Sequence, residues 1–162
     1  MKKIHLFGVM CIVIALDQLS KLWALKHLAL GWPEKLCSGF NFTLAYNRGV
    51  AFSAFYDTGR QSPWFLILMT SLLSVMVLWM LIRTPKAQVQ QRIALSMVLA
   101  GALSNLVDRI HYGAVVDFID VYIGQYHWPV FNVADSAICL GAFLLLFSGY
   151  RDNKNQACQH TK

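Results

Sequence analysis

The sequence predicts an all-α membrane protein with four transmembrane helices, and a small β-hairpin or sheet on the outer membrane surface between the first two. Composition is the first indication, because 57% of the 162 residues are hydrophobic and 14% are charged. A soluble domain carries roughly 25% charged residues. The second indication is a set of apolar runs long enough to cross a bilayer. These features exclude a disordered chain, a nucleic-acid-binding protein and most water-soluble enzymes. We expect a single integral membrane domain over residues 1–162.

The apolar runs cover residues 4–25, 63–82, 93–110 and 131–150. A bilayer core takes about 20 apolar residues as helix, and only a helix satisfies its own backbone in such a run. Pro63 suits the first position of the second helix. The start of the chain resembles a signal peptide, but no A-x-A site follows and the run continues through Asp17. We therefore predict that the first run is a retained span.

The connection between the first two runs contains strand signals. Residues 36–46 alternate in their second half, Asn47, Arg48 and Gly49 form a turn signal, and the apolar residues 50–55 follow. This pattern predicts a hairpin over residues 36–55. The polar tail, residues 151–162, is expected to be disordered and cytoplasmic.

The basic residues predict the orientation of the spans. The net charge is +6, from 14 Lys and Arg against 8 Asp and Glu. Clusters occur at the amino end, between the second and third runs, and in the tail: Lys2 and Lys3; Arg83, Lys86 and Arg92; Arg151, Lys154 and Lys162. Residues 111–129 contain no Lys or Arg. Because Lys and Arg concentrate in cytoplasmic loops, both termini are expected in the cytoplasm.

Carboxylates in or beside the apolar runs indicate a site. They are Asp17, Asp108, Asp117, Asp120 and Asp135. An ionisable group at bilayer depth costs on the order of 3 kcal/mol, so each is a functional candidate. At a rise of ~1.5 Å per residue, Asp17 lies about 20 Å up the first span and Asn105 about 18 Å up the third. Asn132 and Asp135 lie about 2–6 Å below the outer boundary. The polar residues therefore converge on the outer third of the membrane.

Local spacing gives most of these residues a structural interpretation. Asp17 and Lys21, like Asn105 and Arg109, are four residues apart on one helix face, so the first two can form an ion pair that reaches toward the surface. Asp108 beside Arg109 is interpreted as structural support, because buried charges need partners. Asn105 and Asn132 suit interhelical hydrogen bonds. Asp120 is interpreted as a solvated loop residue.

Asp117 and Asp135 differ, because neither has a basic residue within four positions. Two adjacent carboxylates in an apolar setting share one proton, as in an aspartic protease, where one activates water and the other polarises the carbonyl. The same residues also suit a proton relay or ion path. His111 and His127 flank Asp117 and Asp120, but they lack the spacing of a metal site, and no metal or cofactor is expected. Spacing alone leaves the protease and the relay open.

Five blocks in order resemble the lipoprotein signal peptidase (signal peptidase II) family. They are Asp17-Gln18-Leu19-Ser20-Lys21, Asn47-Arg48-Gly49-Val50-Ala51-Phe52, Gly101-Ala102-Leu103-Ser104-Asn105-Leu106-Val107-Asp108-Arg109, Val115-Val116-Asp117-Phe118-Ile119 and Phe131-Asn132-Val133-Ala134-Asp135-Ser136. The resemblance implies an aspartic endopeptidase with Asp117 and Asp135 as the catalytic pair. Substrate binding or support of the pair is implied for Asp17, Lys21, Asn47, Gly49, Asn105, Arg109, Asn132 and Ala134.

The implied substrate is a bacterial prolipoprotein modified with diacylglycerol, cut just before its lipidated cysteine. The implied location is the bacterial cytoplasmic (inner) membrane, with the hairpin and the active site toward the periplasm. Membrane lipid is the other expected partner, nucleic acid is not one, and a monomer suffices to enclose the site. The alternatives are a small membrane transport or proton-relay protein that uses the same carboxylates, and a non-catalytic assembly subunit.

Overall fold

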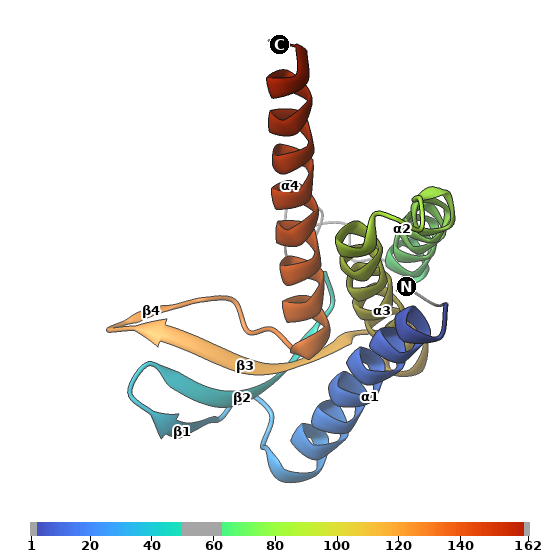
Figure 1. Cartoon of the computed structure of the whole chain (residues 1–162). Coiled ribbons are helices and arrows are strands. Elements are labelled where there is room, and N and C mark those ends of the chain that lie inside the picture. The colour runs from blue at the N-terminus through green and yellow to red at the C-terminus, as the bar shows by residue number, and fades with distance from the viewer. Residues whose placement is uncertain (1–2, 50–62, 161–162) are drawn as a thin grey trace.

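The structure, a computed structural model, describes residues 3–49 and 63–160. Four helices and four strands follow one another in the order α1 (Lys3–His27), β1 (Pro33–Cys37), β2 (Phe40–Asn47), α2 (Pro63–Arg83), α3 (Val89–Tyr112), β3 (Val115–Ile123), β4 (Tyr126–His127) and α4 (Val133–His160) among these residues. The strands form a small sheet that extends to one side of the helices (Figure 1).

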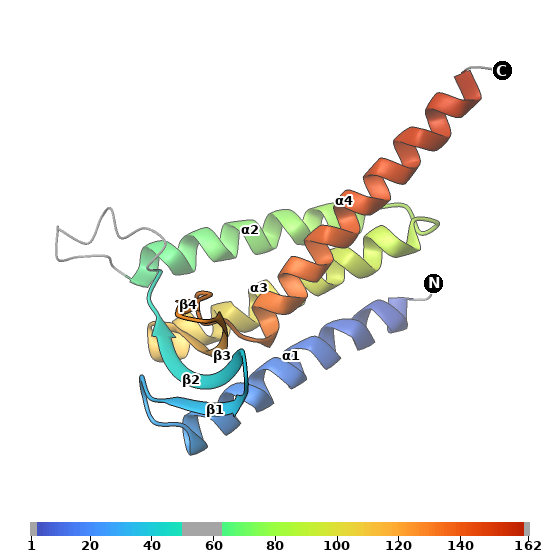
Figure 2. The same ribbon diagram turned by 90° about the vertical axis from the view of Figure 1, so that its left-hand side faces the viewer.

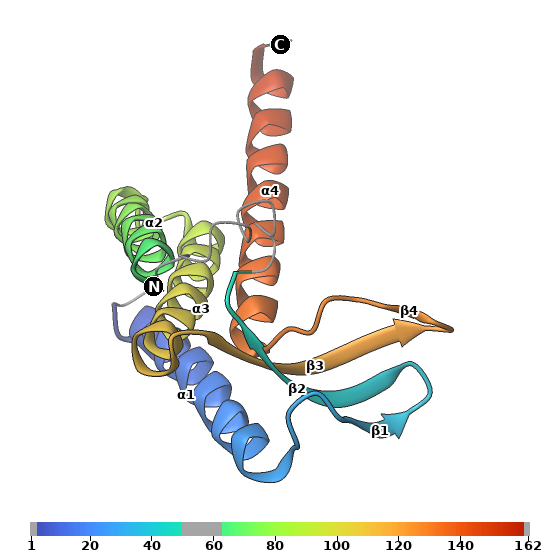
Figure 3. The same cartoon turned by 180° about the vertical axis from the view of Figure 1, so that it is seen from behind.

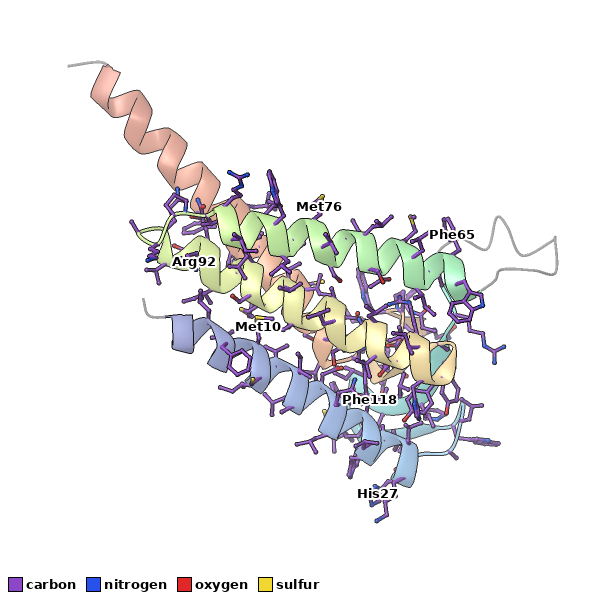
Figure 4. The ribbon with its side chains drawn as sticks, turned by 90° about the vertical axis from the view of Figure 1, so that its right-hand side faces the viewer. Met10, His27, Phe65, Met76, Arg92 and Phe118 are labelled. Atoms are coloured by element: carbon purple, nitrogen blue, oxygen red, sulfur yellow. The ribbon has the colours of Figure 1, made fainter. Side chains whose placement is uncertain are left out.

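The third helix is the centre of the helical part. α3 packs against α1, α2 and α4, whereas α1 meets α4 over a shorter stretch. Figure 2 shows that the C-terminal half of α4 leaves the other helices. The central position explains why α3 is half buried along its span while most side chains of α2 are exposed. Phe65 and Met76 of α2 are among those exposed side chains (Figure 4).

The four helices agree in position with the predicted runs, but their lengths differ. Within the described residues, α1, α2 and α3 are long and apolar enough to cross a membrane, and the apolar part of α4, Val133–Ser148, is shorter. The prediction of a disordered tail from residue 151 differs from the structure, in which α4 continues to His160. Residues 151–160 contain neither proline nor glycine, so no residue in the tail interrupts the helix.

The sheet is antiparallel in the order β1-β2-β3-β4 (Figure 3). β1 and β2 form a hairpin with its turn at residues 38–39, where Gly39 has a φ of 86°. Beyond the sequence expectation, β2 pairs with β3, with Asn41 opposite Asp120 and Ala45 opposite Asp117. The hairpin turn therefore lies nearer the start of the predicted 36–55 region than Asn47, and the strand expected over 50–55 lies outside the described residues.

Two apolar clusters enclose a polar region. One cluster joins the C-terminal end of α1 to the sheet through Ala24, Leu28, Leu44, Val116 and Phe118. The other joins α1, α2 and α3 through Leu6, Leu81, Leu95 and Leu99, with Met10 packed against it. Figure 4 shows Phe118 and Met10 well apart along the molecule. The buried polar side chains described next lie on α1, α3, β3 and the start of α4.

Glycines allow α3 and α4 to pack closely. A Cβ atom on Gly101 would lie 2.5 Å from the carbonyl oxygen of Ala134, and one on Gly141 would lie 2.7 Å from that of Ala94. Small residues at such contacts let two helix backbones approach each other within a membrane. The first of these contacts brings the start of α4 against the middle of α3.

Candidate active site

A buried ionic cluster joins α1 to α3. The ammonium group of Lys21 lies 2.7 Å from a carboxylate oxygen of Asp17 and 2.7 Å from one of Asp108. All three side chains are at most 2% exposed. The predicted pair of Asp17 and Lys21 is therefore confirmed, but the expectation that it reaches toward the surface is wrong, because both side chains are buried. The interpretation of Asp108 with Arg109 is wrong in its partner, because Lys21 from another helix neutralises Asp108.

Asn105 connects this cluster to Asp135. Its Oδ1 accepts a hydrogen bond from Lys21 Nζ at 2.9 Å, and its Nδ2 donates to Asp135 Oδ1 at 2.8 Å. Because an ammonium group can only donate, the contact with Lys21 directs the amide nitrogen of Asn105 toward the carboxylate. The orientation of this amide thus follows from the buried lysine.

Asn132 and Asp135 form a reciprocal cap at the start of α4. The side-chain oxygen of Asn132 accepts from the backbone N–H of Asp135 at 2.8 Å, and Asp135 Oδ2 accepts from the backbone N–H of Asn132 at 3.3 Å. This is the arrangement of a capping box, which satisfies N–H groups that the first helical turn leaves free. The spacing of three residues in the sequence therefore fixes the backbone and the carboxylate of Asp135 together.

Asp117 reaches the same region from the sheet. Asn132 Nδ2 donates to Asp117 Oδ1 at 2.7 Å, and its backbone N–H donates to Asp135 Oδ2, so Asn132 contacts both candidate carboxylates. Burial raises the pKa of Asp117 to about 7, and the negative charge of Asp135 acts in the same direction. Hydrogen bonds from Asn47 and Asn132 and the charge of Lys21 oppose this rise. Asp117 is 1% exposed, and its raised pKa has the direction expected for a buried carboxyl group beside a second carboxylate.

Gln18 and Ser104 also belong to the cluster, although neither was predicted as a site residue. Ser104 donates its hydroxyl proton to Asp17 Oδ2 at 2.7 Å. Gln18 Nε2 donates to Asp108 Oδ1 at 3.0 Å and to Ser104 Oγ at 3.0 Å. Both residues face a carboxylate of the other helix, and helix spacing could have placed them there. Gln18 lies beside Asp17 in the sequence, and Ser104 precedes Asp108 by four residues.

Hydrogen bonds and backbone conformation explain the positions of three further predicted site residues, Ala134, Asn47 and Gly49. The backbone N–H of Ala134 donates to Asp17 Oδ1 at 2.7 Å. Asn47 ends β2, and its Oδ1 accepts from the backbone N–H of Gly49 at 2.9 Å. Gly49 has a φ of 85°, a conformation that other residues rarely adopt. The turn signal at residues 47–49 thus orients the side chain of Asn47.

Arg109 is only partly bonded. Its Nη1 donates to the backbone oxygen of Asn105 at 3.4 Å, and its Nε is buried with no hydrogen-bond partner among the described residues. The carboxylates of Asp117, Asp135 and Asp108 are near enough to act on its charge. Arg109 therefore retains donor capacity beside the two candidate carboxylates.

A cleft opens beside Asp135. It has a volume of about 590 Å³. Its walls are Asn47, Trp128, Pro129, Val130, Phe131, Asp135, Ser136, Ile138 and Cys139. The lining is mainly apolar, and Asp135 is the charged group in it. Such a cleft can hold an extended peptide segment against one carboxylate of the pair.

The expectation that Asp120 is a solvated loop residue is wrong. Asp120 is 3% exposed and accepts hydrogen bonds from Asn41 at 3.2 Å and Thr43 at 3.1 Å, and His127 Nδ1 lies 2.8 Å from it. Burial alone would raise its pKa, but these partners together lower the pKa of Asp120. The residue is a structural carboxylate that joins β2, β3 and β4, because the fold pairs its strand with β2.

Histidine and acidic residues do not gather into a metal site in the described part of the chain. No group of three or more His, Cys, Asp or Glu side chains lies close enough there to hold an ion. His111 instead contacts the ring of Tyr112, and His127 stacks on Tyr122.

Comparison with known proteins gives a consistent result. A family model described as signal peptidase (SPase) II matches residues 9–151. A lipoprotein signal peptidase of Teredinibacter turnerae is 48% identical over 141 residues, which cover 87% of this chain and 84% of the relative. A lipoprotein signal peptidase of Polynucleobacter necessarius is 41% identical over 152 residues, with 94% and 93% covered.

Solved structures agree with the fold. One structure of a bacterial membrane enzyme matches with a TM-score of 0.79 and 28% identity, and covers 89% of this chain and 91% of that chain. Another matches with a TM-score of 0.82 and 27% identity, and covers 93% and 90%. With a family model that spans most of the residues and relatives at up to 48% identity, the chain belongs to the signal peptidase II family.

Proposed function

We propose that this chain is an intramembrane aspartic endopeptidase that removes the signal peptide from diacylglyceryl-modified bacterial prolipoproteins, cutting before the lipidated cysteine. Peptidase activity follows from family membership. The aspartic type rests on one observation: Asn132 bonds to both Asp117 and Asp135 beside a cleft of about 590 Å³. The alternative of a transport or proton-relay protein has no support among the relatives, which carry the name lipoprotein signal peptidase.

The environments of the two carboxylates suggest separate roles. Asp135 accepts hydrogen bonds on both oxygens, from Asn105 and from a backbone N–H, and it lies in the first turn of α4, where the helix dipole favours an anion. Asp117 has a pKa raised to about 7. We assign the carboxylate form to Asp135 and the shared proton to Asp117 at neutral pH.

Hydrolysis then needs one water molecule. Asp135 takes a proton from the water while the water oxygen bonds to the scissile carbonyl carbon. At the same time Asp117 donates its proton to the carbonyl oxygen. When the tetrahedral intermediate collapses, the C–N bond breaks and the proton on Asp135 passes to the nitrogen of the cysteine. Asp117 recovers a proton from one of the two hydroxyl groups of the intermediate, which leaves the signal peptide with a new carboxyl group that then ionises in water.

The surrounding residues have supporting roles in this proposal. Asn105 and Asn132 hold the pair through their amides. Asn47 and Arg109, with donors beside the pair, bind the substrate backbone. Asp17, Lys21 and Ala134 fix the start of α4, and Gly49 forms the turn after Asn47.

The membrane setting follows from the same premises. We propose that all four helices span the bacterial inner membrane, that both termini are cytoplasmic, and that the sheet and the cleft face the periplasm. A signal peptide spans the bilayer, so its cleavage site meets a cleft near the periplasmic surface. The monomer acts with membrane lipid around it and needs no cofactor.

A gel-shift assay tests the proposal. Purified protein in detergent is incubated with a diacylglyceryl-modified prolipoprotein, and the Asp117→Asn and Asp135→Asn variants are compared. Each variant is expected to lose at least about a thousandfold in turnover, because each removes a group that reacts. Circular dichroism and a thermal melt show that the variants are folded. Turnover retained by either folded variant would contradict the aspartic mechanism.

A further inference from the structure

Two buried carboxylates hold the backbone immediately before each candidate catalytic residue. Asp17 Oδ1 accepts from the N–H of Ala134 at 2.7 Å, and Ala134 precedes Asp135. Asp108 Oδ2 accepts from the N–H of Val116 at 3.1 Å, and Val116 precedes Asp117. The two contacts have the same form, although one is to a helix and the other to a strand.

Lys21 joins these two carboxylates. Its ammonium group lies 2.7 Å from Asp17 Oδ2, 2.7 Å from Asp108 Oδ2 and 2.9 Å from Asn105 Oδ1. An ammonium group has three donors, so all three are used. The distance between Asp17 and Asp108 is therefore set by one buried cation.

The other oxygens of the two carboxylates also have donors. Asp17 Oδ2 receives the hydroxyl proton of Ser104, and Asp108 Oδ1 receives Gln18 Nε2. Each of the four carboxylate oxygens thus has at least one donor in the described structure. A buried cluster in which every carboxylate oxygen has a donor has few alternative arrangements, so it is rigid.

We propose that Asp108 is a positioning residue for Asp117, and that Asp17, Lys21 and Asp108 act as one clamp that sets the spacing of Asp117 and Asp135 through the amides of Val116 and Ala134. The proposal rests on the proposed function, in which these two aspartates share a water molecule. It extends that function by giving Asp108 a role in the reaction geometry.

Physical chemistry supports a geometric role over a purely stabilising one. A buried ion pair often contributes little net stability, because desolvation of the charges offsets their attraction. A misplacement of about 1 Å in a reacting group can cost about a hundredfold in rate. A clamp that fixes two backbones therefore affects turnover as well as stability.

The test uses Asp108→Asn. An amide has one acceptor oxygen, whereas Asp108 uses both oxygens for Lys21, Gln18 and Val116, so the variant must lose at least one of these contacts. We expect kcat to fall about a hundredfold, the cost of a misplacement of about 1 Å, with KM changed less than about threefold, because the cleft residues are untouched. The alkaline limb of the pH profile of kcat/KM is expected to move to lower pH. Carboxylates of Asp117 and Asp135 that lie farther apart repel each other less, so the pair loses its shared proton at a lower pH.

Asp120→Asn is the matched control. Asp120 lies on the same strand as Asp117, is equally buried and is also bonded by three partners, but it contacts neither Val116 nor Ala134. We expect its kcat and pH profile to match those of the unsubstituted protein, even where its melting temperature falls. Equal kcat losses in Asp108→Asn and Asp120→Asn would overturn the proposal.

Asp108→Glu covers the case in which Asp108→Asn does not fold. The glutamate keeps the charge for Lys21 but moves the carboxylate by one methylene, so we expect a folded protein with reduced kcat. Full kcat in this variant, or failure of both variants to fold, would overturn the clamp. If the unsubstituted protein does not cleave the lipidated substrate, the proposed function fails. If it does cleave the substrate and Asp108→Asn is unaffected, only the clamp fails.

Discussion

Asn132 shows how much of the candidate site one residue can organise. Its backbone and side chain cap α4, and its Nδ2 lies within hydrogen-bond distance of Asp117 Oδ1, Asn105 Oδ1 and the backbone oxygen of Val116. The contact with Asp117, at 2.7 Å, is the shortest of the three. Asn132 is fully buried, so these contacts exchange little with water. The position of one carboxylate is thereby tied to that of the other.

The titration of Asp117 leads to a prediction about activity. With its pKa at about 7, Asp117 loses the shared proton as the pH rises through neutrality. We expect kcat/KM to decline above about pH 7, by about tenfold per pH unit, because only the singly protonated pair is active. The measurement is a pH profile of cleavage with a lipidated substrate. A profile that stays flat to pH 9, while the protein remains folded, would contradict the assignment.

The same titration affects stability. The folded pKa of Asp117 lies above that of an unfolded carboxyl, so between pH 4 and 7 the folded state binds a proton that the unfolded state has lost. The contribution of Asp117 to the free energy of unfolding therefore falls as the pH rises across this range and is constant above it. Asp117→Asn removes this loss, and it should stabilise the protein above pH 7 by up to about 4 kcal/mol, with little difference near pH 4. Thermal melts of both proteins across this range measure the difference. An inactive variant that is no more stable at pH 8 would argue against the raised pKa.

At the scale of elements, the start of α4 depends on its contact with α3. Ala134 and Asp135 lie in the first turn, and Gly101 of α3 is the residue against which Ala134 packs. Residues 132–135 are held by the cap, by the contact with Asp17 and by this packing. Any shift of the start of α4 therefore also moves the carboxylate of Asp135.

Gly101→Ala tests this dependence. The added methyl group would lie 2.5 Å from the oxygen of Ala134 and 2.8 Å from Ile138, so α4 must move. Overpacking of this kind costs about 1–3 kcal/mol, and the shift should also lower turnover. Gly141→Ala is the control, because it produces a similar clash with Ala94 about two turns further along α4. We expect similar melting temperatures for the two variants but a larger loss of turnover for Gly101→Ala. Equal turnover would show that the pair does not depend on this contact.

Elements differed in how far the sequence predicted them. The helices were predicted because apolar runs depend on local composition alone. β3 was missed: its residues, Val-Val-Asp-Phe-Ile-Asp-Val-Tyr-Ile, are rich in β-branched and aromatic types, but the motif around Asp117 was interpreted without a strand. The partner of β3 is β2, which lies about 70 residues earlier in the chain. No local pattern identifies such a partner, so the environment of Asp120 was predicted wrongly as well.

For the whole molecule, the contacts of the candidate site were likewise predictable where they are local in the sequence and not where they join distant segments. Pairs within one helix turn, such as Asp17 with Lys21, were predicted because spacing determines them. The partner of Asp108 was not, because Lys21 lies on another helix and only the packing of α1 against α3 brings the two together. The helical rise per residue was sufficient to place the polar residues at one depth. It could not give their hydrogen bonds.

The orientation of the whole molecule yields the last prediction. The basic residues favour a cytoplasmic connection between α2 and α3, and the sheet then lies on the periplasmic side. Cys37 is exposed on β1, and Lys86 is exposed in the α2–α3 connection, so the two positions report on opposite sides. With the other cysteines replaced by alanine, a membrane-impermeant maleimide should label Cys37 in intact spheroplasts. A second protein that carries Lys86→Cys and no other cysteine should react only after permeabilisation. Cleavage of a lipidated substrate by both proteins confirms that they are folded. Labelling in the reverse order would place the cleft in the cytoplasm, away from the leaflet in which a prolipoprotein presents its cleavage site.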